Sequence, residues 1–196
     1  MVLFPPDIWK DIPFFKLYPL ISIRDINLVP TLFSMGIKWI QIREKEENLD
    51  SFVQEISKIV KLAKSYDGNI IINDNFKIVK KTNAQGLHLG QEDLSSKEAR
   101  EVIGEKKIIG LSCYKKEEIE EALKNPFVDY IAIGPIFKTP FKEKAPLGVD
   151  ILKRYVNKGK PIVAIGGINK ENIIDVLNAG VDRIAFIRFL EEIIKK

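Results

Sequence analysis

The sequence predicts an α/β fold, a compact (β/α)8 TIM barrel in which eight parallel strands alternate with eight helices. Two observations carry this prediction. Eight short apolar runs recur along the 196 residues, and each is followed by a polar or glycine-rich end and then by a helical pattern. In the clearest of these units, 161–172, the apolar run Ile162–Ile165 leads into Gly166 and Gly167 before a helix expected from Asn169. A doubly wound open sheet is the alternative, but no Gly-x-Gly-x-x-Gly follows the first strand.

The first four expected strands are apolar runs with polar ends, over 18–23, 38–42, 69–72 and 86–89. Helices are expected over 28–35, where Gly36 ends the helix, over 76–81, and from Ser95 or Ser96. After the second strand, Asp50 is expected to cap a further helix. Apolar residues recur along one face of that helix at helical spacing: Phe52, Ile56, Ile59, Val60 and Ala63.

The last four expected strands span 107–112, 129–133, 161–165 and 183–187. Helices are expected over 116–124, 149–156 and 173–177, and a short final helix is expected to run through Lys196. The longest connection runs from Gly134 to Gly148, and loops of this length often carry function. Residues 1–16 show no clear period and are assigned to an N-terminal lead-in segment, and 17–196 to a single barrel domain.

Composition narrows the class of protein. A content of 45% hydrophobic and 30% charged residues is typical of soluble globular proteins. No apolar run approaches the roughly 20 residues of a membrane helix, and no leader is visible, so a cytoplasmic location is expected. The single cysteine, Cys113, and the single histidine, His88, exclude an internal disulfide, cysteine-based zinc sites and histidine clusters. The net charge of +4 is mild and the charges are scattered, so neither nucleic acid nor membrane is an expected partner.

The end of the second strand carries the charges for a diphosphate site. Strand alternation places Gln41, Arg43 and Lys45 on one face, which should point into the mouth of the barrel. Arginine supplies a planar fork and lysine a point charge, a good combination for binding diphosphate. The structural alternative is that Arg43 and Lys45 form salt bridges at the rim with Glu44 or Asp74.

Two carboxylates end neighbouring strands of the predicted barrel. Asp74, with Asn73 beside it, follows the third strand, and Asp93 follows the fourth. Hard oxygen ligands of this kind suit Mg²⁺, which takes one or two carboxylates together with substrate phosphates. As helix caps alone, both residues would be unremarkable.

His88 shares a strand face with Gly90, so it either contacts a ligand or is a hydrogen-bonded interior histidine.

The last three strands are expected to leave an open cavity. Small residues recur there at positions compatible with the interior: Ala132, Gly134, Ala164, Gly166 and Ala185. Barrel enzymes often bind phosphate in this region. Gly166 and Gly167 would let the backbone approach a ligand, and the free N–H groups of the following helix would face an anion. A tight turn without a ligand is the alternative.

Six motifs together resemble thiamine-phosphate synthase, and they follow that family's order and spacing over about residues 18–190. They are Gln41-Ile-Arg-Glu-Lys45, Ile72-Asn-Asp74, His88-Leu-Gly-Gln-Glu-Asp93, Gly110-Leu-Ser112, Gly134-Pro-Ile-Phe-Lys-Thr139-Pro and Ile165-Gly-Gly167. The resemblance implies a transferase of thiamine biosynthesis that joins hydroxymethyl-aminopyrimidine diphosphate to hydroxyethyl-thiazole phosphate. It also implies a dissociative reaction, in which diphosphate leaves before the thiazole nitrogen captures a pyrimidine-methyl cation. The implied partners are these two small molecules. A homodimer is compatible with the exposed helix faces but is not indicated by them.

The resemblance also implies roles for individual residues. Ser112 would lie beside the pyrimidine, and Asp74 and Asp93 would bind Mg²⁺. The residues implied to hold the diphosphate are Gln41, Arg43, Lys45, Asn73 and Lys142. The direct catalytic contributions would come from Arg43, Lys45, Ser112 and Lys142. Further substrate contacts would come from His88, Thr139, Gly166, Gly167 and Arg188.

The chain departs from the family pattern at two positions. Phe141 stands where the family usually has a second threonine, and Arg188 stands where it usually has serine. We expect Arg188 to bind the thiazole phosphate in place of these hydroxyls and Phe141 to cover the substrate. The alternative is that Arg188 turns outward to pair with acidic residues of the final helix.

Two other functions are alternatives to the synthase. A related thiazole tautomerase would need a histidine where Tyr114 stands, and a barrel of this kind could also bind a phosphorylated ligand without turnover.

Overall fold

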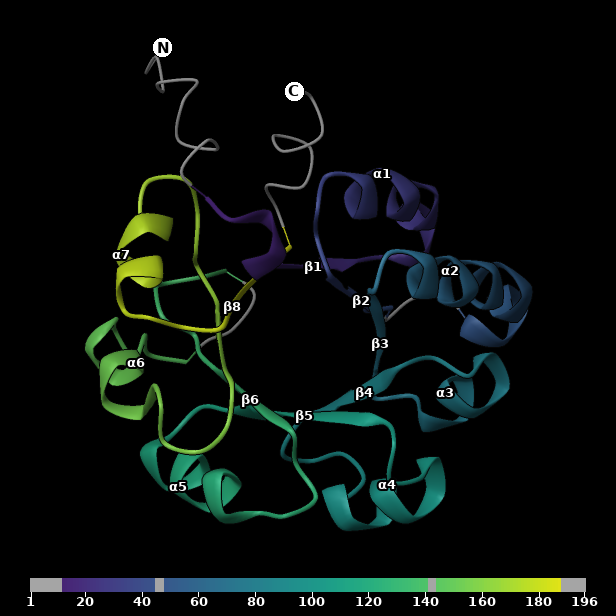
Figure 1. Cartoon of the computed structure of the whole chain (residues 1–196). Helices are drawn as coiled ribbons and strands as arrows, with labels where there is room; N and C mark the ends of the chain where they lie inside the picture. Colours follow the sequence, from purple (N-terminus) through teal and green to yellow (C-terminus); the bar gives the residue numbers. More distant parts are fainter. Residues whose placement is uncertain (1–11, 45–47, 141–143, 188–196) are drawn as a thin grey trace.

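A computed structural model describes residues 12–44, 48–140 and 144–187 (Figure 1). Eight parallel strands pair in chain order, and β1 also pairs with β8, so the sheet closes into a barrel. The strands are β1 (Leu17–Ile21), β2 (Trp39–Ile42), β3 (Asn69–Asn73), β4 (Gly86–Leu89), β5 (Ile108–Cys113), β6 (Tyr130–Ile133), β7 (Ile162–Ile165) and β8 (Arg183–Phe186). This topology confirms the predicted (β/α)8 barrel.

Figure 1 shows the helices as a ring around the outside of the barrel. Within the ranges described, the α-helices are α1 (Val29–Ser34), α2 (Val53–Ser65), α3 (Phe76–Thr82), α4 (Ser96–Ile103), α5 (Lys116–Lys124), α6 (Asp150–Tyr155) and α7 (Ile173–Asn178). Three 3-10 helices precede β1, α1 and α2: η2 (Phe14–Lys16), η3 (Ile23–Leu28) and η4 (Leu49–Phe52). The final helix expected through Lys196 lies outside the described residues.

The start of the helical segment after β2 differs from the prediction. Asn48, not Asp50, is the cap, because its side chain accepts the N–H of Asp50 (3.0 Å) at the start of η4. The Asp50 carboxylate instead accepts from Lys81 on α3 at 2.7 Å. The start of α4 is as predicted, since Ser95 forms a capping box with Glu98.

The strands bury both of their faces. Their outward residues, such as Ile40 and Ile42, pack beneath the helices in the main core. Their inward residues form a smaller cluster inside the barrel: Tyr18, Leu20, Ile71, Tyr130, Ala132, Val163 and Ala185. Ala164, expected to face the cavity, belongs to the helix-side core, because the inward position on β7 is taken by its neighbour Val163.

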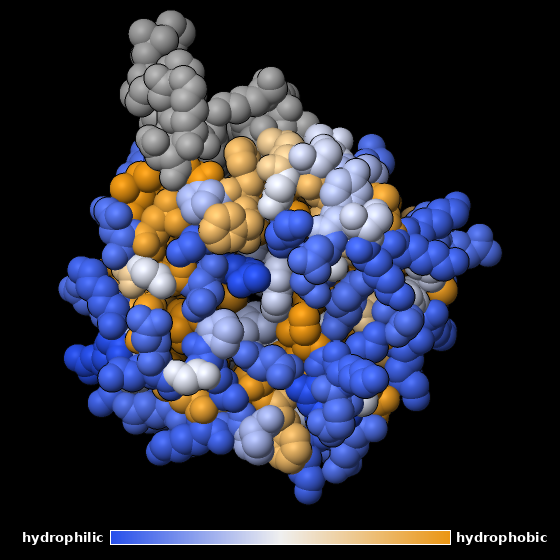
Figure 2. All heavy atoms as spheres, in the orientation of Figure 1, coloured by the Kyte–Doolittle hydropathy of each residue, from blue (hydrophilic) through white to orange (hydrophobic). Residues whose placement is uncertain are grey.

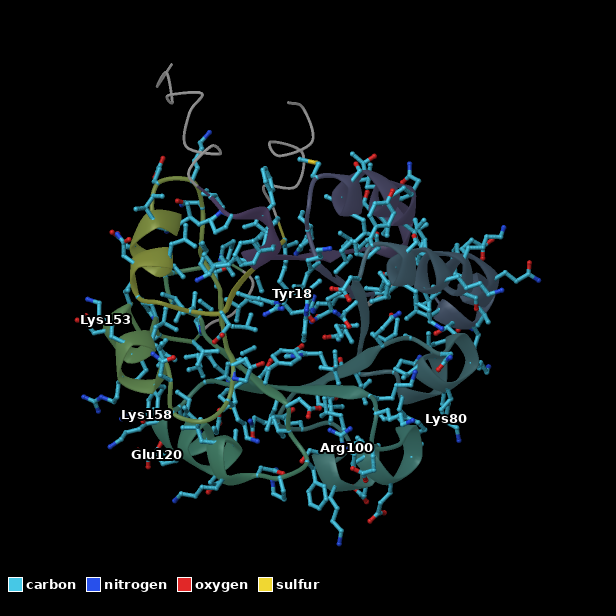
Figure 3. The ribbon with its side chains drawn as sticks, viewed as in Figure 1. Tyr18, Lys80, Arg100, Glu120, Lys153 and Lys158 are labelled. Carbon is cyan, nitrogen blue, oxygen red and sulfur yellow. The ribbon has the colours of Figure 1, made fainter. Side chains whose placement is uncertain are left out.

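Hydrophilic side chains cover much of the face shown in Figure 2. Lysines and acidic residues alternate along the outer helices, as the scattered charges of the sequence indicate; Lys153, for example, binds Asp150 one turn earlier on α6 at 3.0 Å. Figure 3 shows Lys80, Lys153 and Lys158 pointing away from the barrel. No helix in the described part of the chain has both the length and the apolar character of a membrane span.

Four lysines join neighbouring strands at the base of the barrel, where the strands begin. Each lies one or two residues before a strand, and its ammonium group donates to a backbone carbonyl of the segment that leads into an adjacent strand. The bonds run from Lys16 to Val181 (2.9 Å), Lys38 to Tyr66 (2.5 Å), Lys107 to Ala84 (2.7 Å) and Lys160 to Val128 (2.6 Å). They connect β1 with β8, β2 with β3, β5 with β4 and β7 with β6. All eight strands are therefore linked in pairs by charge-assisted bonds.

Aromatic rings and one guanidinium group fill the base of the barrel interior. The Trp39 ring lies edge-on to Tyr18 and Tyr130, with centroids 5.6 Å and 5.3 Å away. The Arg183 guanidinium lies over Trp39, 4.3 Å from its centroid. Gly110 on β5 makes room for Tyr130, because a Cβ there would lie 2.0 Å from the tyrosine ring. These groups pack the base, whereas the cavity described below opens at the end where the strands finish.

One buried arginine organises two loops at the base. Arg100 on α4 is only 4% exposed, and its guanidinium donates to backbone carbonyls on both sides of β5. The acceptors are the carbonyl oxygens of Gly104, Glu105, Lys107 and Phe127 and the Asp129 carboxylate. The same carboxylate oxygen accepts the N–H of Ile109 at 2.7 Å. Figure 3 shows Arg100 beside α4.

We expect Arg100→Lys to lower the free energy of unfolding by about 2–4 kcal/mol, because the ammonium group cannot reach all five acceptors and leaves buried carbonyls without a donor. Urea unfolding followed by circular dichroism measures the change. Arg154→Lys, at an exposed position on α6, is the matched control and should change the stability by less than about 0.5 kcal/mol. Equal and small losses in both variants would contradict the structural role of Arg100.

Candidate active site

A cavity of about 460 Å³ opens at the end of the barrel where the strands finish. All eight strands or the loops after them contribute to its wall, and its volume is typical of a small-molecule site. Ten of the predicted site residues line it: Gln41, Arg43, Asn73, Asp74, His88, Asp93, Ser112, Thr139, Gly166 and Gly167. The other predicted site residues, Lys45, Lys142 and Arg188, lie outside the described residues, as does Phe141.

The two predicted metal ligands stand on neighbouring loops. Asp74 follows β3 with a φ of 59°, a left-handed conformation that is unusual for a residue other than glycine. Its N–H donates to the carbonyl of His88 at 2.8 Å, and its carboxylate accepts the Asn73 amide at 2.6 Å. Asp93 accepts the N–H of Gly90 at 2.6 Å, and a Cβ at position 90 would lie only 2.9 Å from that carboxylate. A side-chain amide therefore holds the Asp74 carboxylate at the mouth, and a backbone N–H holds that of Asp93.

The Asp74 carboxyl group has a perturbed acidity. Burial, the hydrogen bond with Asp93 and the negative charge of Asp93 together raise its pKa to about 6, while Arg43 and Asn73 oppose the shift. Two carboxylates held this close favour a proton or a cation between them, and the hard oxygen donors suit a divalent ion such as Mg²⁺. Among residues 12–44, 48–140 and 144–187, no group of three or more His, Cys, Asp or Glu side chains is placed so that it could hold a metal ion. Further ligands to an ion here would therefore include water or substrate oxygens.

Arg43 lines the cavity wall next to this pair, as strand alternation predicts. For Arg43 the alternative, a salt bridge at the rim with Glu44 or Asp74, is not formed, since no ion pair involves Arg43 in the part of the chain that the structure describes. Glu44 instead accepts the N–H of Ile23 at 3.2 Å. The guanidinium group therefore contributes positive charge to the cavity.

Below the charged mouth lies a row of hydrogen-bonded polar side chains. Gln41 donates to the Tyr18 hydroxyl at 2.9 Å, which lies 2.9 Å from the Tyr130 hydroxyl. The Tyr130 hydroxyl lies 2.8 Å from His88 Nδ1, and His88 Nε2 lies 2.9 Å from Ser112 Oγ. His88 thus fits both interpretations of the sequence: it is a buried, hydrogen-bonded histidine and it lines the cavity. The sequence analysis did not identify Tyr18 and Tyr130 as site residues. The signal in the sequence was a hydroxyl-bearing side chain within an otherwise apolar strand.

Gln41 lies deeper than a diphosphate ligand should. Its side chain is 2% exposed, and its amide nitrogen is committed to Tyr18. Its buried Oε1 has no hydrogen-bond partner in the described part of the protein. A carbonyl oxygen repels phosphate oxygens and accepts from N–H groups, so Gln41 fits recognition of a ring with a donor rather than of diphosphate.

The glycine turn after β7 is shaped by a neighbouring loop. Gly166 and Gly167 adopt φ values of 96° and 68°. A Cβ on Gly166 would lie 2.6 Å from Pro135, and one on Gly167 would lie 2.6 Å from the carbonyls of Phe137 and Lys138. Because both glycines also line the cavity, the turn serves the packing of the two loops as well as access to a ligand.

The helix expected from Asn169 begins four residues later, at Ile173. Asparagine side chains occupy the intervening turn: Asn172 accepts the N–H of Asn169, and Asn169 accepts the N–H of Glu171, both at 2.9 Å. These two N–H groups are therefore not free for an anion, contrary to the prediction. The backbone N–H groups of Gly167 and Ile168 have no acceptor among the residues described.

The loop from β6 to α6 is closed at its neck by backbone hydrogen bonds. Leu147 donates to Pro135 at 2.8 Å and Gly148 donates to Ile136 at 3.1 Å. On the other side, Ile136 and Phe137 donate to the carbonyls of β7 and the glycine turn, at 3.0 Å and 2.9 Å. Further along, the Lys144 ammonium lies 3.8 Å from the centroid of the Tyr114 ring, at the wall of the cavity.

The single cysteine takes no part in this site. Cys113 is fully buried on the helix side of β5 and does not line the cavity. Burial, together with the nearby charge of Glu118, raises the pKa of its thiol to about 12. The thiolate, which is the reactive form, is therefore scarce at neutral pH.

Comparison with known proteins identifies relatives of the chain. The family model of thiamine monophosphate synthase matches residues 18–190. The thiamine-phosphate synthase of Dictyoglomus turgidum is 40% identical over 167 residues, which are 84% of this chain and 74% of the relative. That of Caldicellulosiruptor saccharolyticus is 38% identical over 166 residues, 83% of this chain and 75% of the relative.

Solved structures agree with these matches. A thiamine phosphate pyrophosphorylase from Pyrococcus furiosus superposes with a TM-score of 0.78 at 33% identity, covering 89% of this chain and 86% of that one. A 3-hexulose-6-phosphate synthase, at 12% identity and a TM-score of 0.63, covers 90% of this chain and 92% of that one and shows the barrel fold alone. The matches confirm the resemblance seen in the sequence and do not favour the tautomerase or the non-catalytic barrel. The chain belongs to the thiamine monophosphate synthase family and is a transferase of the thiamine-phosphate synthase type.

Proposed function

We propose that the cavity condenses hydroxymethyl-aminopyrimidine diphosphate with hydroxyethyl-thiazole phosphate, giving thiamine phosphate and diphosphate. One observation carries the proposal: two regions suited to anions face each other across a single cavity. Arg43 and the Asp74–Asp93 pair form one region, and the glycine turn with Thr139 forms the other. The first suits a diphosphate with its divalent ion, and the second suits a phosphate monoester.

At the first region, the bond between the pyrimidine methylene carbon and the diphosphate oxygen breaks, and the electron pair leaves with the diphosphate. Arg43 and Asn73 bind the departing group, joined in our proposal by Lys45 and Lys142, which lie outside the described residues. Asp74 and Asp93 would hold Mg²⁺, which when bound neutralises charge on the diphosphate. The wall beside this bond is apolar and would keep water from the resulting pyrimidine-methyl cation. Its residues are Leu20, Ala132, Val163, Ile165 and Ala185.

The aminopyrimidine ring fits the space above the polar row. The orphaned Gln41 carbonyl suits an amino group, and the Ser112 hydroxyl suits a ring nitrogen, with His88 holding Ser112 in place. The thiazole nitrogen then attacks the cation and forms the C–N bond. No proton has to leave either substrate for this bond to form, so the step needs no general base.

The second region would bind the thiazole phosphate. The unoccupied N–H groups of Gly167 and Ile168 and the Thr139 side chain line the cavity on this side. We place Arg188 here as an additional phosphate ligand and Phe141 as a cover over the substrate, although both residues lie outside the described ranges. A cytoplasmic location, a homodimer and a separate lead-in over residues 1–16 remain predictions.

The proposed reaction is tested by incubating the purified protein with both substrates and Mg²⁺ and measuring thiamine phosphate and diphosphate. Omission of either substrate, or addition of EDTA, should abolish product.

Asp74→Asn and Asp93→Asn should each lower kcat by on the order of 100-fold, because stabilisation of the leaving group is the main catalytic contribution. Asp50→Asn, which removes only the exposed pair with Lys81, is the control and should be fully active. Turnover within about threefold of wild type in both cavity variants, at limiting Mg²⁺, would contradict the assignment of Asp74 and Asp93 as ligands of Mg²⁺.

The pH dependence of metal binding follows from the acidity of Asp74. Its pKa of about 6 means that the free pair holds a proton below that pH, and a divalent ion must displace this proton. The apparent affinity for Mg²⁺ or Mn²⁺ should therefore fall by about tenfold per pH unit below about pH 6 and level off above about pH 7. Calorimetry in two buffers of different ionisation enthalpy measures both the affinity and the proton released. An affinity that is constant from about pH 5 to 7.5, with no proton release, would contradict the shared proton.

Arg43→Lys tests the anion site beside the carboxylates. The variant keeps the charge but loses the planar fork, so inhibition by diphosphate should weaken by roughly 1–3 kcal/mol, or about 5- to 150-fold. Arg154→Lys on the outer surface of α6 is again the matched control. If diphosphate inhibits Arg43→Lys and Arg43→Ala as strongly as wild type, Arg43 belongs to the rim and not to the substrate site.

A further inference from the structure

A continuous line of hydrogen bonds crosses the barrel interior from β2 to β5. Its members are Gln41, Tyr18, Tyr130, His88 and Ser112, and every link measures 2.8–2.9 Å. The strands that supply Tyr18 and Tyr130, β1 and β6, are not neighbours in the sheet, so this link passes directly through the interior. Figure 3 shows Tyr18 inside the barrel. Tyr130 does not line the cavity, and among the residues described its hydroxyl bonds to Tyr18 and His88.

The surrounding residues hold this line in one position. A Cβ at Gly110 would lie 2.4 Å from the Tyr130 hydroxyl, so the glycine is what admits the tyrosine. The Trp39 ring is nearly perpendicular to both tyrosine rings, at 87° and 85°, and supports them from the base. Both tyrosine pKa values are raised because the rings are buried, so both hydroxyls stay protonated at neutral pH.

The number of protons restricts how the line can be arranged. Each tyrosine has one O–H, and a neutral imidazole has one N–H, while each of these groups makes two contacts along the line. A neutral imidazole must accept at one nitrogen and donate at the other. A hydroxyl can accept twice, but the buried Tyr18 and Tyr130 hydroxyls have no acceptor outside the line among the residues described, so each proton is used within the line and all links point the same way. Gln41 donates to Tyr18. Tyr18 must then donate to Tyr130, Tyr130 to His88 Nδ1, and His88 Nε2–H to Ser112.

We propose that Tyr18 and Tyr130 are positioning residues that fix His88 as its Nε2–H tautomer. Ser112 then accepts from His88, and its own hydroxyl proton is left to donate into the cavity. The ligand that such an end recognises is a ring nitrogen with a free lone pair, as an aminopyrimidine supplies. The choice of ring depends on the proposed function, whereas the tautomer does not.

The tautomer can be measured directly, because His88 is the only histidine in the chain. Protein labelled with ¹⁵N-histidine gives one imidazole, whose two nitrogen shifts distinguish a protonated from an unprotonated ring nitrogen. At about pH 8, where a neutral imidazole is expected, wild type should show Nε2–H alone. Tyr130→Phe removes the donor to Nδ1, and a population with Nδ1–H should appear. An Nδ1–H tautomer in wild type, or an unchanged tautomer in Tyr130→Phe, would overturn the proposal.

Kinetics supply a second readout and a control. Tyr130→Phe should raise the KM for the pyrimidine diphosphate by on the order of tenfold and leave the KM for the thiazole phosphate within about twofold. Tyr155→Phe loses a hydroxyl that, in the described part of the chain, donates to Glu120 on the outside of the barrel, and it should change neither value. Equal increases in both KM values for Tyr130→Phe would also overturn the proposal. If Tyr130→Phe does not fold, Tyr18→Phe breaks the preceding link and is measured in the same way. A wild-type protein without synthase activity would refute the proposed function, while the nitrogen shifts would still decide the tautomer.

Discussion

Pairing of β1 with β8 closes the sheet, and the rest of the molecule depends on this closure. It leaves no sheet edge, fixes the width of the interior and brings all strand ends to one rim, so residues distant in sequence share one cavity. At the opposite rim, charge-assisted hydrogen bonds link the strands. Lys16 bridges the β1–β8 seam, and three further lysines bridge the other strand pairs. These four lysines therefore have a structural use at the base and do not by themselves mark an anionic partner.

Depth along the barrel axis separates the tasks of the interior residues. At the base, Arg183 and Trp39 fill the space with large rings and a guanidinium group. In the middle, hydroxyl and imidazole groups satisfy one another where no water is needed. At the mouth, small side chains such as Ala132 and Ala185 leave room, and the charged groups stand on loops fixed by backbone hydrogen bonds. Rigid packing below thus supports an open and charged site above, which is the arrangement that a preorganised electrostatic catalyst requires.

Local sequence patterns were sufficient to predict the strands and the side chains that stand at their ends. The strand over 86–89 has the predicted bounds, and alternation along β2 correctly turns Arg43 toward the mouth. Contacts across the interior were not predictable in this way, because nothing near Tyr18 in the sequence marks its partner Tyr130, 112 residues away. The predicted helix starts were wrong where several possible capping residues lie within a few positions of one another, as at Asn48 and Asp50. The roles of Lys45, Lys142 and Arg188 remain predictions.

The neck of the loop between β6 and α6 has a consequence for how this protein can diverge. Hydrogen bonds from Leu147 and Gly148 back to Pro135 and Ile136 join the two ends of the loop before it departs from the barrel. An insertion beyond such a neck leaves the strand and helix in place, and doubling the length of a flexible loop costs only about 0.6 kcal/mol in closure entropy. The segment between the neck residues is thus a natural graft point. A different acceptor substrate could be accommodated by replacing this one segment, provided that a cation in the place of Lys142 is kept for the diphosphate, while the barrel beneath stays unchanged.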